Sequence, residues 1–237
     1  MFKEFTCVDL SDQIEPISDA WERQNITFDG IYTGYLASEE QCGQVAQFFD
    51  RFSGNDPLIV VDPAMADNGK FYPAFGESFP KAMAKVCAKA DVILPNITEA
   101  ALLTGMPYKT EYDRAYIREL LEKLLELGCK TAGLTGVSFE PGRLGAAYLD
   151  RDGKEFTYFT KWCEQSYHGT GDIFASTVTG ALMRGLDLGD ALTIAADYVV
   201  ACIEQTAASE SGRWYGAEFE PVIPQLCQMV EEKVSAI

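Results

Sequence analysis

Residues 167–172 read Tyr-His-Gly-Thr-Gly-Asp, and residues 173–181 continue as Ile-Phe-Ala-Ser-Thr-Val-Thr-Gly-Ala. The glycines on either side of Thr170 let the backbone approach a ligand closely and adopt positive φ. The small and apolar residues after Asp172 predict a helix, whose first turn offers unpaired N–H groups and the positive end of the helix dipole. Such a helix start is a cradle for an anion, and a carboxylate at its edge suits phosphoryl transfer. The same residues are equally consistent with a Gly-rich turn in which Asp172 is an ordinary N-cap.

Short apolar runs alternate with helical patterns along the rest of the chain. Strands are expected at residues 28–34, 58–61, 92–94 and 131–134, and as a hairpin at 146–149 and 155–159. Helices are expected at residues 38–53, 81–89, 98–104, 111–127, 172–185, 189–208 and 220–235. Apolar strands between helices indicate an α/β fold with a mostly parallel sheet that is covered on both faces. Because no repeat or linker interrupts this pattern, we expect residues 1–237 to form a single domain.

Polar residues follow several of the expected strands directly. Asp62, Asn96 and Gly136 stand at such strand ends, and the turn at Gly169 follows the hairpin. Ligands of parallel sheets bind beyond the carboxyl ends of the strands. We therefore expect these positions to converge on one rim of the sheet.

Each of these positions has a chemical and a plain structural interpretation. Asp62 can hold a Mg²⁺-bound water or face a phosphate, or it can simply begin an Asp-Pro turn. Glu99 lies three residues after Asn96 on the same helical face, where a carboxylate can bind magnesium or can merely satisfy the helix start. Thr135 and Gly136 can touch nucleotide phosphates or can be an ordinary strand exit.

The composition narrows the class of partner and the compartment. The 237 residues carry a formal net charge of −17, which repels nucleic acid and anionic membranes. The seven cysteines are scattered and form no CxxC pair, which is typical of reduced thiols in a cytoplasmic protein. His168 is the only histidine, so a His-based metal site or a Ser/His/Asp triad is not expected.

The order of these motifs resembles the ribokinase superfamily, and within it the pyridoxal kinase branch of the vitamin kinases. Residues 62–72 read Asp-Pro-Ala-Met-Ala-Asp-Asn-Gly-Lys-Phe-Tyr and are the most discriminating stretch. Hydroxymethylpyrimidine-phosphate kinases usually lack this Asp-Asn-Gly-x-x-Tyr continuation. Residues 31–36, Ile-Tyr-Thr-Gly-Tyr-Leu, are also similar to a strand of pyridoxal kinases. The resemblance covers essentially the whole chain.

The resemblance implies a three-layer ribokinase-like fold and ATP-dependent phosphorylation of the 5′-hydroxyl of pyridoxal, pyridoxamine or pyridoxine. Asp172 would take the hydroxyl proton, and the amides of residues 169–171 would stabilise charge on the transferring phosphoryl group. Asp62 and Glu99 would organise Mg²⁺, and Asn96 would help to position phosphates. The resemblance also implies a small-molecule substrate, a B6 vitamer, and a homodimer.

Family members usually begin with a strand, a helix and a second strand ahead of the point where Met1 stands. The resemblance therefore implies an N-terminally shortened fold with exposed apolar surface or an unpaired strand edge. Three explanations stay open: a wrongly assigned start, a partner subunit that covers the gap, or loss of catalysis. The alternatives to a B6 kinase are accordingly a hydroxymethylpyrimidine(-phosphate) kinase of thiamine synthesis and a catalytically inactive nucleotide-binding homologue.

Overall fold

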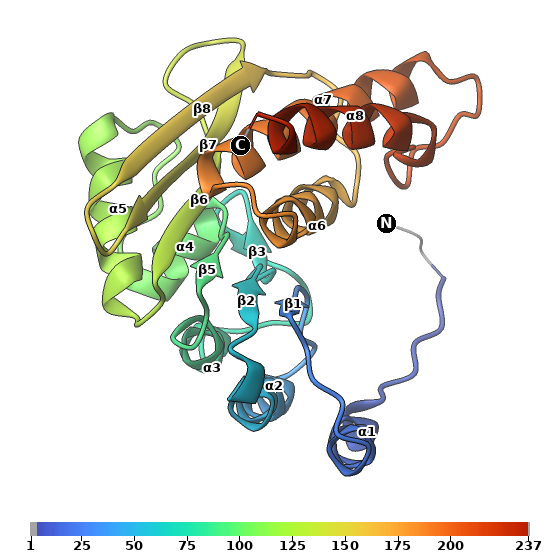
Figure 1. The fold of residues 1–237 in the computed structure, drawn as a ribbon. Helices are drawn as coiled ribbons and strands as arrows, with labels where there is room; N and C mark the ends of the chain where they lie inside the picture. Colours follow the sequence, from blue (N-terminus) through green and yellow to red (C-terminus); the bar gives the residue numbers. More distant parts are fainter. Residues whose placement is uncertain (1–3, 237) are drawn as a thin grey trace.

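The computed structural model describes residues 4–236, and a six-stranded sheet runs through its centre (Figure 1). The strand order is β1 (Gly30–Thr33), β2 (Leu58–Val61), β5 (Val92–Ile93), β6 (Thr131–Val137), β7 (Arg143–Asp150) and β8 (Glu155–Lys161). The first four strands are parallel, and β7 and β8 add an antiparallel meander to β6. A separate antiparallel pair is formed by β3 (Ala66–Asp67) and β4 (Lys70–Phe71). The expected mostly parallel sheet is thus confirmed.

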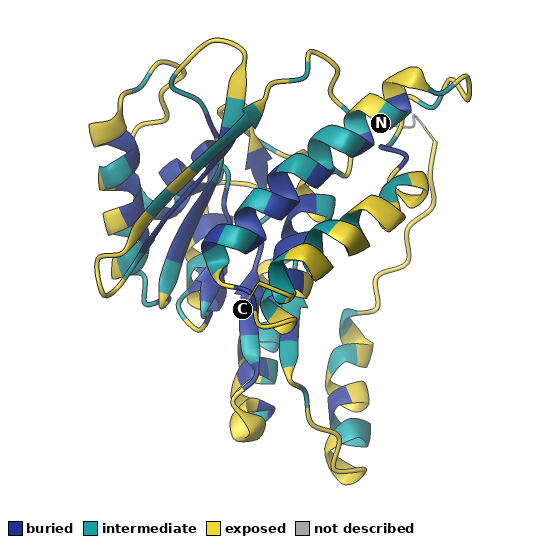
Figure 2. Ribbon diagram, turned by 45° about the horizontal axis from the view of Figure 1, so that its top comes forward, coloured by how far each residue is buried: buried dark blue, intermediate teal, exposed yellow. Residues whose placement is uncertain are grey.

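Helices cover both faces of the sheet and give it three layers. One face carries α2 (Glu39–Arg51), α3 (Phe79–Cys87), α4 (Ile97–Thr104) and α5 (Arg114–Glu126). The other face carries α6 (Thr170–Met183), α7 (Leu188–Ala208) and α8 (Ile223–Val234). Short 3₁₀ turns occupy Ser53–Asn55 and Glu220–Val222. Figure 2 shows the buried residues gathered on the sheet and on the helix faces that pack against it.

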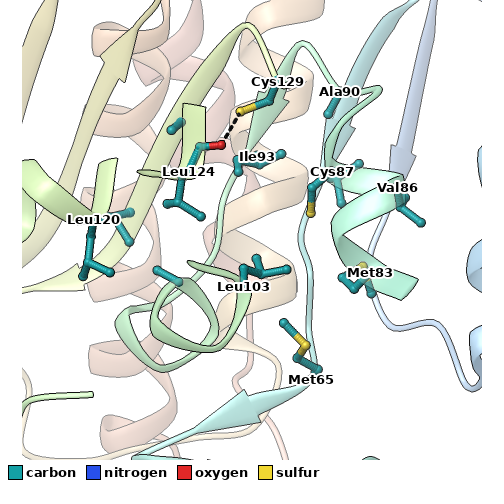
Figure 3. Close-up of a cluster of buried hydrophobic side chains, with 14 of the residues drawn as sticks. Met65, Met83, Val86, Cys87, Ala90, Ile93, Leu103, Leu120, Leu124 and Cys129 are labelled. Atoms are coloured by element: carbon teal, nitrogen blue, oxygen red, sulfur yellow. Dashed lines mark hydrogen bonds between the residues drawn. The ribbon is translucent and has the colours of Figure 1, made fainter. Parts of the chain in front are cut away.

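Each face has its own apolar core. The core on the α2–α5 side is drawn in part in Figure 3, where Leu120 and Leu124 of α5 approach Ile93 of β5. The cysteines of this core are reduced, and the Sγ of Cys129 donates to the Leu124 carbonyl at 3.5 Å. All seven cysteines are free, and four of them are buried, whereas Cys7 and Cys227 are exposed.

Local sequence explains where most of the helices begin. The side chains of Ser38, Asp113 and Asp187 accept hydrogen bonds from the first turns of α2, α5 and α7. Pro80 lies in the first turn of α3, where its missing N–H costs nothing. Such caps are short-range signals, so the predicted boundaries of these helices lie within a few residues of the observed ones.

Helix α1 (Ser11–Arg23) was not predicted, because Pro16 within it removes one backbone donor. Its contacts with α2 and with the segment before β1 hold it in place. Trp21 packs edge-on against Phe28 with ring centroids 5.4 Å apart, and Arg51 of α2 pairs with Asp19 at 2.6 Å. The chain before α1, residues 4–10, is exposed, and β1 forms one edge of the sheet.

Candidate active site

The polar residues that follow the parallel strands lie side by side at one rim of the sheet. Asp62 directly follows β2, and its N–H donates to the carbonyl of Thr33 at the end of β1, at 2.8 Å. Asn96 follows β5 and forms a parallel bridge with Thr135 of β6. The strand pairing therefore brings Asp62, Asn96 and the end of β6 to one rim, as expected for these three positions.

Asn96 and Glu99 form a reciprocal capping box at the start of α4. Asn96 Oδ1 accepts from the Glu99 N–H at 3.0 Å, and Glu99 Oε2 accepts from the Asn96 N–H at 2.8 Å. Glu99 Oε1 also accepts from the N–H groups of Met65 and Ala66, at 3.0 and 3.4 Å. The side chain is only 3% exposed. Glu99 thus ties the loop after β2 to the first turn of α4, which is the structural interpretation of this residue.

The stretch 62–72 folds as a tight hairpin beside this box. Asn68 and Gly69 adopt positive φ of 50° and 74° between β3 and β4, as a two-residue Asn-Gly hairpin turn requires. The Gly69 N–H donates to Thr98 Oγ1 at 3.0 Å, and Asn96 Nδ2 donates to the Ala66 carbonyl at 2.8 Å. The Asp-Asn-Gly sequence is therefore needed to bring this loop against α4.

The Gly-Thr-Gly-Asp stretch forms the N-terminus of α6. Gly169 is the N-cap residue with φ of 86°, and the helix begins at Thr170. Asp172 is consequently the third residue of the helix, so the alternative in which it is the N-cap is wrong. A Cβ built on Gly169 or on Gly171 would meet no atom within 4 Å, so the space beside both residues is open. Asp172 is exposed.

The exposed carboxylate of Asp172, in α6, lies near the buried carboxylate of Asp62, and their charges interact. Burial raises the pKa of Asp62 to about 7, and the negative charge of Asp172 adds to this rise. Burial and the charge of Asp62 also raise the pKa of Glu99 to about 8, although its three backbone donors act in the opposite direction. None of the ion pairs among residues 4–236 involves any of these three carboxylates. The rim thus gathers three carboxyl groups with no basic side chain paired to them among the described residues.

Such an arrangement is suited to a cation that arrives with the ligand. Among the described residues no group of three or more His, Cys, Asp and Glu side chains could hold a metal ion alone. Mg²⁺ usually takes only one or two carboxylates and completes its shell with phosphate oxygens and water. Asp62 fits that role, because its carboxylate is buried, accepts no hydrogen bond from the described residues and lies near a second negative charge. The oxygens of Glu99 are already engaged by backbone donors.

The remaining predicted positions, Thr135 and Gly136, lie in β6 next to Asn96. The Thr135 N–H donates to the Pro95 carbonyl at 2.9 Å. Gly136 has φ of 72° at an irregularity in the pairing of β6 with β7, and space is open beside it. Contact of these two residues with a nucleotide stays a prediction.

Two residues near Asp172 were not singled out from the sequence. The pKa of Tyr32 is raised by its burial and by the charges of Asp62 and Asp172. A Cβ built on Gly34 would lie 3.3 Å from the Tyr32 hydroxyl oxygen and 4.0 Å from Asp172 Oδ1. A tyrosine and a glycine at a strand end are common in sequences. Only the packing of α6 over β1 shows that these two residues lie near Asp172.

Comparison with known proteins agrees with this geometry. The sequence pattern of the phosphomethylpyrimidine kinase family matches residues 12–217. The chain belongs to this family of kinases. Membership places it among the phosphotransferases and agrees with the expected use of ATP, with Mg²⁺ as the usual partner ion.

Individual relatives divide between two substrates. The hydroxymethylpyrimidine/phosphomethylpyrimidine kinase of Bacillus subtilis is 27% identical over 205 residues, which are 86% of this chain and 72% of that protein. A crystal structure from Bacteroides thetaiotaomicron, assigned as a phosphomethylpyrimidine kinase, superposes with a TM-score of 0.91 at 33% identity and covers 95% of this chain and 78% of that one. Another crystal form of that protein contains pyridoxal. Pyridoxal kinase from Lactobacillus plantarum superposes with a TM-score of 0.86 at 29% identity and covers 98% and 84% of the two chains.

These similarities confirm the ribokinase-like, pyridoxal kinase-like fold that the motif order predicted. The kinase class is established by the family, whereas the choice between pyridoxal and hydroxymethylpyrimidine is not. Within residues 4–236, no helix is long and apolar enough to cross a membrane.

Proposed function

We propose that this chain is an ATP-dependent kinase that phosphorylates the 5′-hydroxyl of pyridoxal, pyridoxamine or pyridoxine. The proposal rests on the proximity of Asp62 and Asp172 and on the open space beside the N-terminus of α6. A triphosphate that binds at this helix start would lie against unpaired backbone donors, with a carboxylate at hand for the acceptor.

Each residue of the rim has a distinct part in the proposed reaction. The amides of residues 169–171 would bind the γ-phosphate and stabilise its developing charge, which is the largest contribution that a protein makes to such reactions. Asp172 would accept the proton of the acceptor hydroxyl. Asp62 would hold Mg²⁺, with Glu99 supporting the loop that carries it, and Asn96 would help to position the phosphates. Bound Mg²⁺ supplies neutralisation of the phosphate charge.

Two features support a B6 vitamer as the acceptor. The hairpin of residues 62–72 carries the Asp-Asn-Gly-x-x-Tyr sequence by which the chain resembles pyridoxal kinases. The ring of Tyr35 is 53% exposed at the rim and lies 5.2 Å, centroid to centroid, from Phe75, so a flat heteroaromatic ring could pack there. The B. thetaiotaomicron relative that was crystallised with pyridoxal adds to this support.

Hydroxymethylpyrimidine or its phosphate is the alternative acceptor, because the B. subtilis relative bears that name. It also presents a primary alcohol on a flat heteroaromatic ring, so the same rim would accommodate its chemistry. We further propose that residues 1–237 act as one kinase domain; the homodimer and the cytoplasmic location remain predictions.

A coupled assay of ADP release decides between the acceptors. The protein is supplied with MgATP and, in turn, with pyridoxal, pyridoxamine, pyridoxine, hydroxymethylpyrimidine and hydroxymethylpyrimidine phosphate. We expect the highest kcat/KM with a B6 vitamer. A preference for a pyrimidine would replace the proposed substrate, and ADP release that no acceptor stimulates would contradict a kinase acting on either class.

A further inference from the structure

The N-terminus of α6 packs against a small apolar cluster that is formed by later segments of the chain. The buried members of this cluster are Tyr198 and Cys202 of α7, and Ala217. Two partly buried residues, Tyr167 and Ile173, pack against it. These two residues stand before and after the cradle, whose backbone donors are those of residues 169–171. The cradle is therefore flanked on both sides by side chains that rest on this cluster.

A backbone hydrogen bond joins the cluster directly to the cradle. The Ala217 N–H donates to the carbonyl oxygen of His168 at 3.3 Å. His168 immediately precedes Gly169, and the peptide between them is trans. Because a trans peptide is planar, the Gly169 N–H points away from the His168 carbonyl oxygen. The hydrogen bond from Ala217 thus sets the direction of the first backbone donor of the cradle.

Glu218, the residue after Ala217, is tied to the last turn of α7. The Glu218 N–H donates to Thr206 Oγ1 at 2.7 Å, and this hydroxyl donates to the Cys202 carbonyl at 2.6 Å. Glu218 and Thr206 are only 8% and 5% exposed, so water does not compete for these bonds. The backbone beside Ala217 therefore has a fixed place relative to α7.

The Glu218 carboxylate organises the loop that follows α7. Its Oε1 accepts hydrogen bonds from Ser211 Oγ and, at 3.2 Å, from Ser209 Oγ, and Arg213 Nε lies 3.7 Å away. The hydroxyls of the two serines accept in turn from the N–H groups of Ser211 and Arg213, each at 3.2 Å. The hydrogen bond from Ser211 lowers the pKa of Glu218, so its side chain is a charged acceptor at neutral pH. One carboxylate thus holds residues 209–213 in place.

We propose that Glu218 is a positioning residue of the cradle: through Ala217 it fixes the carbonyl of His168 and so aims the Gly169 N–H at the γ-phosphate of ATP. The proposal rests on the kinase function proposed above. Glu218 acts on the reaction only through other residues and touches neither the nucleotide nor the acceptor. Its effect is large enough to measure because a donor stabilises the transferring phosphoryl group only when it is already aimed at it.

Two substitutions remove the two hydrogen-bonded contacts of Glu218 separately. Glu218→Ala removes the acceptor for the loop, and Thr206→Val removes the acceptor for the Glu218 N–H. Glu218→Gln and Thr206→Ser are their conservative partners, because each keeps an oxygen at the same place. Glu204→Ala is the control, because Glu204 is an exposed carboxylate of α7 that pairs with Lys161 of β8 at 2.5 Å.

The measurements separate an effect on the γ-phosphate from an effect on the rest of the nucleotide. For every protein we would measure kcat from ADP release with the acceptor that the parent prefers, and the thermal midpoint. Titration calorimetry without acceptor gives the dissociation constants of Mg²⁺-bound β,γ-methylene-ATP and of Mg²⁺-bound ADP. Only the first of these two ligands carries a γ-phosphate for the Gly169 N–H to meet.

Glu218→Ala and Thr206→Val are each expected to lower kcat roughly tenfold, which is part of the 10²–10³-fold that a whole preorganised donor supplies. The triphosphate analogue should bind about fivefold more weakly, the weight of one weakened hydrogen bond, whereas ADP should bind as to the parent. Glu218→Gln, Thr206→Ser and the control should stay close to the parent in all of these quantities.

A merely structural role would lower the thermal midpoint and leave the ratio of the two dissociation constants unchanged, and this result would overturn the proposal. Equal weakening of the analogue and of ADP would overturn it too, because Glu218 would then act on a part that both nucleotides share. If Glu218→Ala does not fold, Thr206→Val supplies the same measurements.

Failure of this proposal is distinguishable from failure of the kinase function. If the parent phosphorylates an acceptor and the folded variants match it in kcat and in both dissociation constants, the positioning role is overturned and the kinase function stands. If the parent turns over no acceptor, the kinase proposal fails, and the ratio of the two dissociation constants alone decides the positioning role. A parent that binds the analogue no more tightly than ADP has no γ-phosphate contact to position, which overturns the proposal.

Discussion

The capping box around Glu99 and the pair of carboxylates Asp62 and Asp172 lie at the same rim, but they differ in the hydrogen-bond partners of their buried carboxyl groups. Glu99 is 3% exposed, and three backbone N–H groups donate to its oxygens. Asp62 is 8% exposed, yet its side chain accepts no hydrogen bond from residues 4–236 and lies near a second negative charge. Burying a polar group costs little when its partners are supplied, and much when they are not. Burial raises the pKa of both carboxyl groups, but only Glu99 has backbone donors that oppose this rise. Glu99 therefore ties two segments of the fold together, whereas Asp62 has no partner among the described residues and would gain one from a cationic ligand.

The largest expected effect is at the carboxylate that faces the acceptor. Asp172→Asn removes the proton acceptor but preserves the shape of the first turn of α6. A general base of this kind contributes roughly 10²–10⁴-fold, so we expect kcat to fall about 10³-fold while the dissociation constant of ATP stays close to the parent value. Steady-state ADP release and nucleotide titration check both parts. Turnover of pyridoxal at the parental rate would show that Asp172 is not the base.

The second prediction concerns Asp62→Asn, which changes the buried carboxylate that accepts no hydrogen bond from the described residues. The folded-state pKa of Asp62 is about 7, above the value of about 4 for an unfolded aspartate. The protonated form of Asp62 therefore contributes its full stabilisation of the folded state below about pH 4. This contribution is lost as the pH rises through about 7. Without Mg²⁺, we expect the unfolding free energy of the variant to exceed that of the parent by on the order of 3 kcal/mol above pH 7, with little difference near pH 4.

Urea unfolding at a series of pH values measures this difference, and titration with MgATP should show weaker binding by the same variant. A gain in stability with a loss of ligand affinity is what a strained binding site predicts. A difference in unfolding free energy that does not change with pH would mean that Asp62 is not strained by its surroundings.

Glu99→Gln makes the same chemical change, from carboxylate to amide, at the carboxylate that accepts three backbone hydrogen bonds. The amide nitrogen that replaces one carboxylate oxygen meets a backbone N–H, from Asn96 or from Met65, and leaves that donor unpaired. We expect a loss of about 2 kcal/mol in unfolding free energy, the cost of a buried donor without a partner. Urea unfolding next to Asp62→Asn provides the control, because that side chain loses no hydrogen bond to the described residues. A gain in unfolding free energy for Glu99→Gln would mean that the cost of burying this carboxyl group outweighs its hydrogen bonds.

The smallest expected effect concerns the two glycines of the α6 cradle. Gly169 has φ of 86°, a conformation that costs a side-chain-bearing residue about 1–2 kcal/mol, so Gly169→Ala should destabilise the protein by that amount. Gly171 lies within the helix without positive φ, and alanine there should add about 0.5–1 kcal/mol. Thermal unfolding of both variants measures this. If Gly171→Ala lowers turnover despite its higher stability, the open side of the cradle is where the phosphate binds; unchanged turnover would contradict that.

Several features of the site could be predicted because they depend on short stretches of sequence. The capping box needs only an Asn and a Glu three residues apart, and the hairpin of β3 and β4 needs only an Asn-Gly turn between paired residues. Parallel strands carry their carboxyl ends to one rim, so Asp62, Asn96 and Gly136, which each follow an expected strand, were expected at the same rim. These signals act over a few residues or follow from the topology of the sheet.

Other features depend on contacts between distant segments, which no local pattern contains. Helix α1 exists despite Pro16, because aromatic packing against α2 and the ion pair of Arg51 with Asp19 hold it. The hydrogen bonds from the backbone of Met65 and Ala66 to Glu99 could not be predicted from its sequence, because these donors lie more than thirty residues away along the chain.

By itself, the sequence of this kinase determined the layered fold, the rim and the carboxylates that stand on it, because periodicity, caps and turns act locally. The tertiary structure alone decided which carboxylate has backbone donors and which has none, and it set Tyr32 near Asp62 and Asp172. The physical reason is that burial and charge proximity arise only when β1, β2 and α6 are packed together.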